Sequence, residues 1–75
     1  MKSRTVTGTV KTWNSEAGWG VLVSPDAPAE VWVHFSAIEG DGYRELSEGA
    51  TVEFAFRKVL NQDGYRFVAG FVRVA

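Results

Sequence analysis

The stretch from Trp19 to Phe35, WGVLVSPDAPAEVWVHF, contains two short apolar and β-branched runs separated by a polar, proline-containing segment. Runs of this kind are typical of β-strands. Pro25 and Pro28 fall between the runs, where their missing N–H groups interrupt no strand ladder. We therefore expect one strand at residues 19–23 and another at residues 30–35.

Similar runs, separated by turn residues, continue along the rest of the chain, and no segment has the three-and-four spacing of an amphipathic helix. Residues 61–64, Asn-Gln-Asp-Gly, have the composition of a tight hairpin turn. The longer connection at residues 36–49 has room for at most one helical turn, at residues 36–38. The sequence predicts an all-β fold with five strands, at residues 4–13, 19–23, 30–35, 50–59 and 65–74.

Size and composition limit the kinds of protein this can be. A chain of 75 residues is about half the size of a typical domain, so we expect one domain at residues 1–75. The chain has no cysteine and one histidine, which excludes disulfides and metal sites built from cysteines or several histidines. No signal core or membrane-spanning stretch is visible. We expect a cytoplasmic protein with no metal, cofactor or membrane partner.

Alternation along the strands separates a core face from an outward face. In the fourth predicted strand, Val52, Phe54 and Phe56 share one side and are expected in the core. The opposite set in the first three predicted strands is rich in aromatic rings. The residues expected on this outward face are Lys11, Trp13, Trp19, Trp32 and His34.

An outward face with several tryptophans needs a partner, because soluble monomers rarely expose such a patch without a use for it. Flat rings beside scattered cations suit unpaired nucleobases, which stack on aromatic side chains. The net charge of −1 gives no support of its own to a nucleic-acid partner. Two alternatives remain open: the rings are packed on both sides, or the face docks a protein partner or a second copy of the chain.

The sequence offers little for catalysis. His34 has no cysteine or second histidine to work with, and Ser36 nearby lacks the third group that a nucleophilic site needs. No phosphate-binding loop of the lysine-threonine kind is present. We expect a protein that is not an enzyme.

Two motifs carry a family resemblance. Residues 17–22, AGWGVL, resemble the first ribonucleoprotein motif of bacterial cold-shock proteins, and residues 31–38, VWVHFSAI, resemble the second motif and the turn that follows it. Matching residues on either side extend the similarity from about residue 8 to residue 54. Beyond it, Arg66-Phe67-Val68 replaces a glycine-proline-glutamine segment of the family.

The resemblance implies a five-stranded antiparallel Greek-key barrel of the oligonucleotide-binding (OB) type that binds single-stranded RNA or DNA. It implies an RNA chaperone that disfavours secondary structure and affects transcription or translation. Lys11 would hold phosphate, His34 would stack or donate to a base edge, and the aromatic positions would stack bases. The predicted nucleic-acid-binding residues are Lys11, Trp13, Trp19, Val21, Trp32, His34, Phe35 and Tyr43.

Several positions depart from the family pattern. Thr12, Ala17 and Val21 stand where the family usually has tryptophan, lysine and phenylalanine, so we expect weaker binding than is typical. Strict alternation points Phe35 inward, but its place at the end of a strand is expected to let it reach the rim. We expect the protein to be a monomer.

Overall fold

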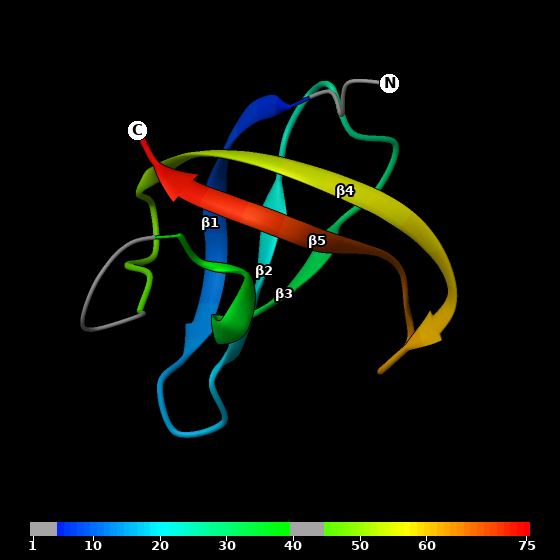
Figure 1. Cartoon of the computed structure of the whole chain (residues 1–75), viewed down its shortest axis with the longest axis horizontal. Coiled ribbons are helices and arrows are strands. Elements are labelled where there is room, and N and C mark those ends of the chain that lie inside the picture. The colour runs from blue at the N-terminus through cyan, green and yellow to red at the C-terminus, as the bar shows by residue number, and fades with distance from the viewer. Residues whose placement is uncertain (1–4, 40–44) are drawn as a thin grey trace.

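The computed structural model describes residues 5–39 and 45–75, which form five strands and one short 3-10 helix (Figure 1). The elements are β1 (Val6–Asn14), β2 (Trp19–Val23), β3 (Val31–His34), η1 (Phe35–Ala37), β4 (Thr51–Gln62) and β5 (Tyr65–Val74). The predicted number and order of strands are confirmed, and β2 and β5 have the predicted bounds. Within these residues, the single short helix is far from the length and apolar character that crossing a membrane requires.

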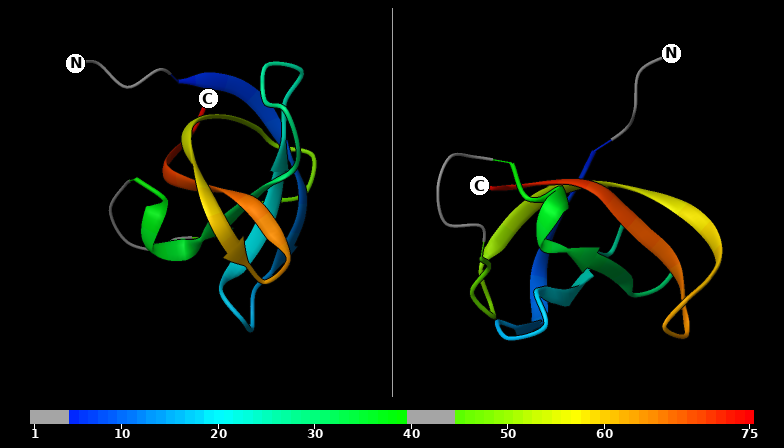
Figure 2. Two further views of the ribbon diagram at one scale, coloured as in Figure 1. Left: turned by 90° about the vertical axis from the view of Figure 1, so that its right-hand side faces the viewer. Right: turned by 60° about the horizontal axis from the view of Figure 1, so that its bottom comes forward.

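The strands close into a barrel in the order β1-β2-β3-β5-β4, and Figure 2 shows this ring from two further sides. Four neighbouring pairs are antiparallel, whereas β3 and β5 are parallel, with Trp32 opposite Val68. The predicted five-stranded all-β barrel is confirmed, and its one parallel pairing lies between β3 and β5. The reason is geometric, because strand directions cannot alternate all the way around a ring of five.

The barrel interior is filled by aliphatic and phenylalanine side chains from all five strands. The largest fully buried side chains are Phe54, Leu22, Val31, Val33, Val52 and Val72. The predicted core positions Val52 and Phe54 are confirmed, and Phe56 is half-buried and packs against this core. Each of the larger side chains contributes about 1.5–3 kcal/mol by leaving water, which is how so small a domain holds together.

A register shift in β1 between Val10 and Thr12 determines which way Trp13 faces. Val10 lies opposite Leu22, and after the shift Trp13 lies opposite Gly20. A bulge adds one residue and so reverses the alternation beyond it. Trp13 therefore packs against the core, and its predicted place on the outward face was wrong.

The hairpin of β4 and β5 is long, and its end extends past the rest of the barrel (Figures 1 and 2). Asp63 and Gly64 connect the two strands with φ angles of 51° and 89°, as a two-residue hairpin turn requires. The Gly64 N–H donates to Asn61 Oδ1 at 2.7 Å. The predicted turn is confirmed, although β4 continues to Gln62, three residues beyond the predicted end of the strand.

Candidate nucleic-acid interface

Four aromatic side chains from β2, β3 and η1 form a continuous row on the outside of the barrel. We call Trp19, Trp32, His34 and Phe35 the aromatic row. The ring centroids are 6.1 Å apart for Trp19 and Trp32, and 5.8 Å apart for Trp32 and His34. His34 and Phe35 follow at 4.5 Å. The first two pairs have interplanar angles of 24° and 19°, so three of the rings present nearly parallel planes.

The strand register explains why these rings meet. Trp19 lies opposite His34 in the pairing of β2 with β3, and Trp32 is two residues before His34 on the same strand. Residues two apart on a strand share a face, and the diagonal neighbour across the ladder is within reach of an aromatic side chain. Val31 and Val33, which alternate with them, are fully buried in the core. The predicted face of Trp19 and His34 is therefore confirmed, and Trp32 shares that face but is buried on it.

The side chains of the aromatic row differ in solvent exposure. Trp19 and His34 are half-buried, but Trp32 is only 9% exposed although it lies outside the core cluster. Its direct partner Val21 is 3% exposed, and Val68, opposite Trp32 on β5, is also buried. The expectation that Trp32 is open to solvent was wrong, because the β4–β5 hairpin closes the barrel beside it. Val21 likewise presents almost no surface, so these two residues offer little area for contact.

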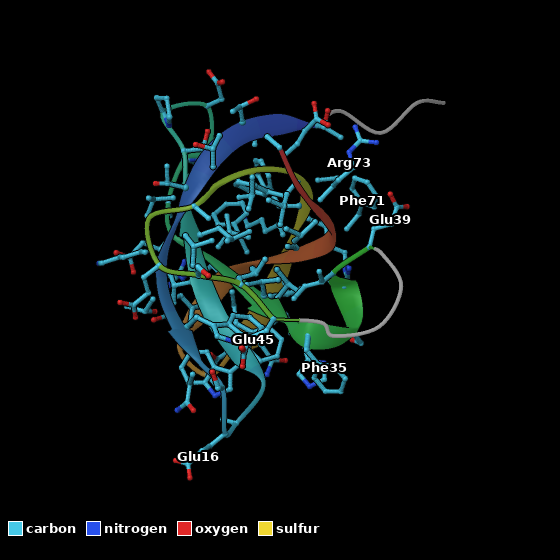
Figure 3. All side chains as sticks on the ribbon, turned by 90° about the vertical axis from the view of Figure 1, so that its left-hand side faces the viewer. Glu16, Phe35, Glu39, Glu45, Phe71 and Arg73 are labelled. Atoms are coloured by element: carbon cyan, nitrogen blue, oxygen red, sulfur yellow. The ribbon has the colours of Figure 1, made fainter. Side chains whose placement is uncertain are left out.

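Phe35 reaches the rim, as its place at the strand end suggested. It is 42% exposed, and Figure 3 shows its side chain projecting away from the barrel beside η1. The chain leaves β3 after His34 and turns into the 3-10 helix, so the alternation that would bury Phe35 ends there. The Phe35 N–H donates to the Gly18 carbonyl oxygen at 2.8 Å, which anchors this end of the row to the turn before β2.

The ring of His34 is held in one orientation by Ser36. The backbone N–H of Ser36 donates to His34 Nδ1 at 3.3 Å, and the Ser36 hydroxyl lies 2.9 Å from the same nitrogen. A ring nitrogen that accepts from a backbone N–H carries no proton, so the neutral ring has its proton on Nε2. His34 can therefore stack and donate one hydrogen bond at the same time.

Lys11 forms an ion pair on the surface. Its ammonium pairs with the Glu30 carboxylate, and both side chains are about half exposed. The hydrogen bond and the charge of Glu30 raise the pKa of Lys11, so the ammonium stays charged at any physiological pH. Solvent screens such a pair, and phosphate competes with the carboxylate for the same cation.

Two other predicted positions stand apart from the row. Trp13 packs against the core, and its Nε1 is buried without a hydrogen-bond partner among the described residues. Tyr43 lies outside the described residues. Among the residues that the structure does describe, no cluster of three potential metal ligands occurs.

The sequence has a second basic region near the last hairpin, at Arg57, Lys58, Arg66 and Arg73, which is expected to widen the track of positive charge, but no spacing placed it beside the row. Arg57 and Gln62 line a groove together with Trp32 and His34. The position of Arg57 beside Trp32 and His34 depends on strands that are distant along the chain. Only the closed barrel brings them together.

The closed all-β barrel with aromatic rings along β2 and β3 has the architecture of an OB fold. Residues 6–68 match the family model described as "'Cold-shock' DNA-binding domain", and the chain belongs to this family. The match extends past residue 54, where the motif resemblance ended. Cold-shock proteins bind nucleic acids and are not enzymes, so this chain is a nucleic-acid-binding protein and not an enzyme.

Curated bacterial proteins share much of the sequence. The major cold shock protein of Micrococcus luteus is 53% identical over 47 residues, which cover 63% of this chain and 70% of the relative. Cold shock-like protein CspC of Escherichia coli is 41% identical over 61 residues, 81% of each chain. Cold shock protein CapA of Pseudomonas fragi is 43% identical over 56 residues, 75% of this chain and 88% of the relative.

Proposed function

We propose that this protein binds single-stranded RNA or DNA by stacking unpaired bases on the aromatic row and acts as an RNA chaperone. The observation that carries the proposal is the continuity of the row, in which neighbouring ring centroids lie 4.5–6.1 Å apart. Base–aromatic stacking contributes about 1–3 kcal/mol per base and tolerates any sequence.

The proposed contacts differ in kind along the row. Phe35 and Trp19 provide the accessible stacking surfaces, and His34 adds a ring and an Nε2–H donor for a base edge or a phosphate. Lys11 contributes a cation near β2 that a phosphate shares with Glu30. With Val21 and Trp32 covered, fewer platforms are open than the motif alone suggests, which supports the expectation of modest affinity.

Modest affinity suits a chaperone. A protein that binds only the open strand shifts the equilibrium of an RNA hairpin toward the open form by mass action, and needs no nucleotide hydrolysis. Fast release then lets the strand pair correctly or enter transcription or translation. We propose that the protein acts as a monomer in the cytoplasm, where a domain without cysteines depends on no disulfide.

The test is a titration with oligouridine and oligothymidine at low salt, read by tryptophan fluorescence, with the matching duplex as control. We expect the single strands to quench the fluorescence and the duplex to do so much less. An unchanged signal at high micromolar strand would contradict the proposal. The chaperone activity is read separately from the opening of a fluorophore–quencher RNA hairpin, in which the Phe35→Ala protein should open less of the hairpin at equal concentration.

A further inference from the structure

We propose that the groove between β3–η1 and the β4–β5 hairpin is an additional nucleotide site, in which Arg57 binds a phosphate of the strand that occupies the aromatic row. The inference rests on the proposed function and extends it to a residue of the hairpin. The inference concerns where the nucleic-acid strand runs beyond His34.

The groove has the size and position for this role. Its volume is about 390 Å³, within the range of roughly 300–1,000 Å³ that ligand pockets occupy. Trp32, His34 and Ser36 form one wall, and the hairpin forms the other. Because Trp32 and His34 belong to both the row and the groove, a strand that stacks on the row reaches the groove without crossing another element.

The chemistry of the lining suits an anion. Arg57 is exposed, and among the described residues that line the groove it is the only lysine or arginine and none is acidic. The ion pairs of residues 5–39 and 45–75 use Lys11 and Arg73, so no described carboxylate pairs with Arg57. A guanidinium has the planar fork of donors that matches phosphate oxygens. Gln62 adds an amide that can donate to and accept from a base edge.

Gly70 makes room for this guanidinium. A Cβ on Gly70 would lie 3.2 Å from the terminal Nη1 of Arg57, closer than ordinary van der Waals contact. Gly70 has no positive φ, so backbone strain does not explain a glycine at this position. The missing side chain lets Arg57 lie over the backbone of β5 on the groove side of the hairpin.

Trp32 lines the groove and, among the described residues, carries an unpaired polar atom. Its Nε1 is buried and has no hydrogen-bond partner within the described part of the chain, although a buried N–H donor usually has one. Trp32 is about nine-tenths buried and lines the groove.

The experiment compares the wild type with Arg57→Gln, Arg57→Lys and a matched control, Lys58→Gln. Lys58 is the next residue of β4, is exposed, does not line the groove and, by strand alternation, points to the other side of the hairpin. Oligothymidines of roughly 4 to 10 nucleotides, spanning the lower site sizes of OB folds, are titrated at several salt concentrations. Urea unfolding of each protein checks that the exposed substitutions leave the fold intact.

We expect wild-type affinity to rise when the strand becomes long enough to enter the groove. Arg57→Gln should lose this gain in affinity with strand length and bind the long strand roughly fivefold more weakly. Its logarithmic salt slope should be smaller by about 0.7, as for one lost phosphate contact. Arg57→Lys should keep the salt slope and recover only part of the affinity. Lys58→Gln should match the wild type in the length increment.

The outcomes separate the two proposals. If no single strand binds the wild type, the proposed function fails together with this site. If the wild type binds but Arg57→Gln has the same affinity, salt slope and length dependence, the row binds nucleic acid and the groove does not. Equal losses in Arg57→Gln and Lys58→Gln would show a diffuse charge effect and would also overturn the proposed site.

Discussion

The ring of Phe35 lies directly against Gly18. A Cβ on Gly18 would lie 2.9 Å from Phe35 Cδ1, and Gly18 has a φ of 75°, which residues with side chains rarely adopt. The accessible end of the aromatic row therefore depends on a glycine in the turn before β2. Both its backbone angle and its empty side-chain position are needed.

Gly18→Ala tests this support. We expect it to destabilise the fold by about 1–2 kcal/mol through backbone strain and to displace the Phe35 ring, which weakens oligonucleotide binding. Gly49→Ala is the matched control, because Gly49 has a φ of 87° but no described residue beyond its chain neighbours within 4 Å of an added methyl group. It should lose stability with unchanged affinity. Urea unfolding measures the stability of both variants, and titration with an oligonucleotide measures their affinity. Equal affinity in the two variants would contradict the role of the contact between Gly18 and Phe35.

Gly20→Ala should be far more damaging. A Cβ there would lie 2.3 Å from the Thr12 carbonyl oxygen and 2.7 Å from Trp13 Cε3, so β1 and β2 would have to separate. We expect a loss of about 3 kcal/mol in the free energy of unfolding, a large share of the stability of a small domain. Urea denaturation measures it. A loss below about 1 kcal/mol would show that Trp13 does not pack on Gly20 as described.

Substitution of the two tryptophans of the row should separate an effect on folding stability from an effect on oligonucleotide binding. Trp32→Ala removes a side chain that is 9% exposed and should cost about 3 kcal/mol of stability. Trp19→Ala removes a half-buried ring, so it should cost less stability but about 1–3 kcal/mol of binding energy. Thermal unfolding and labelled-oligonucleotide anisotropy give the two values. The reverse ranking in stability would contradict the observed burial.

Glu30→Gln should strengthen nucleic-acid binding. It removes the carboxylate that pairs with Lys11 and leaves the ammonium to phosphate alone. We expect higher affinity at low salt and a logarithmic salt slope steeper by up to about 0.7. Stability should change little, since the pair is exposed and screened by solvent.

The pKa of Lys11 gives the pH dependence of this effect. Because Glu30 raises that pKa, the pair's small contribution to stability is present below the ordinary lysine pKa of about 10.4 and is lost only as pH rises through the higher folded value. The gain from Glu30→Gln should therefore be the same between about pH 6 and pH 9. A gain that disappears within that range would show that Lys11 is not the cation involved.

The strands and core could be predicted because they depend on local patterns. Alternation placed Val52 and Phe54 in the core and Trp19 and His34 outside, and the Asp63–Gly64 turn follows from its composition. These features are set by neighbouring residues within a strand or a turn.

Features that depend on distant strands escaped prediction. The bulge after Val10 turned Trp13 inward, and nothing in the sequence marks its position. Trp32 is covered because β5 returns beside β3, and Arg57 reaches the groove for the same reason. Alternation tells which face a side chain occupies, but not what else comes to lie on that face.

The most direct test of the central claim is the detection of intermolecular NOEs by NMR between the protein and a bound oligothymidine. Stacking on the aromatic row predicts contacts from thymine methyl and sugar protons to the rings of Trp19, His34 and Phe35. Contacts confined to other surfaces, with these three rings unperturbed at saturating strand, would contradict the claim.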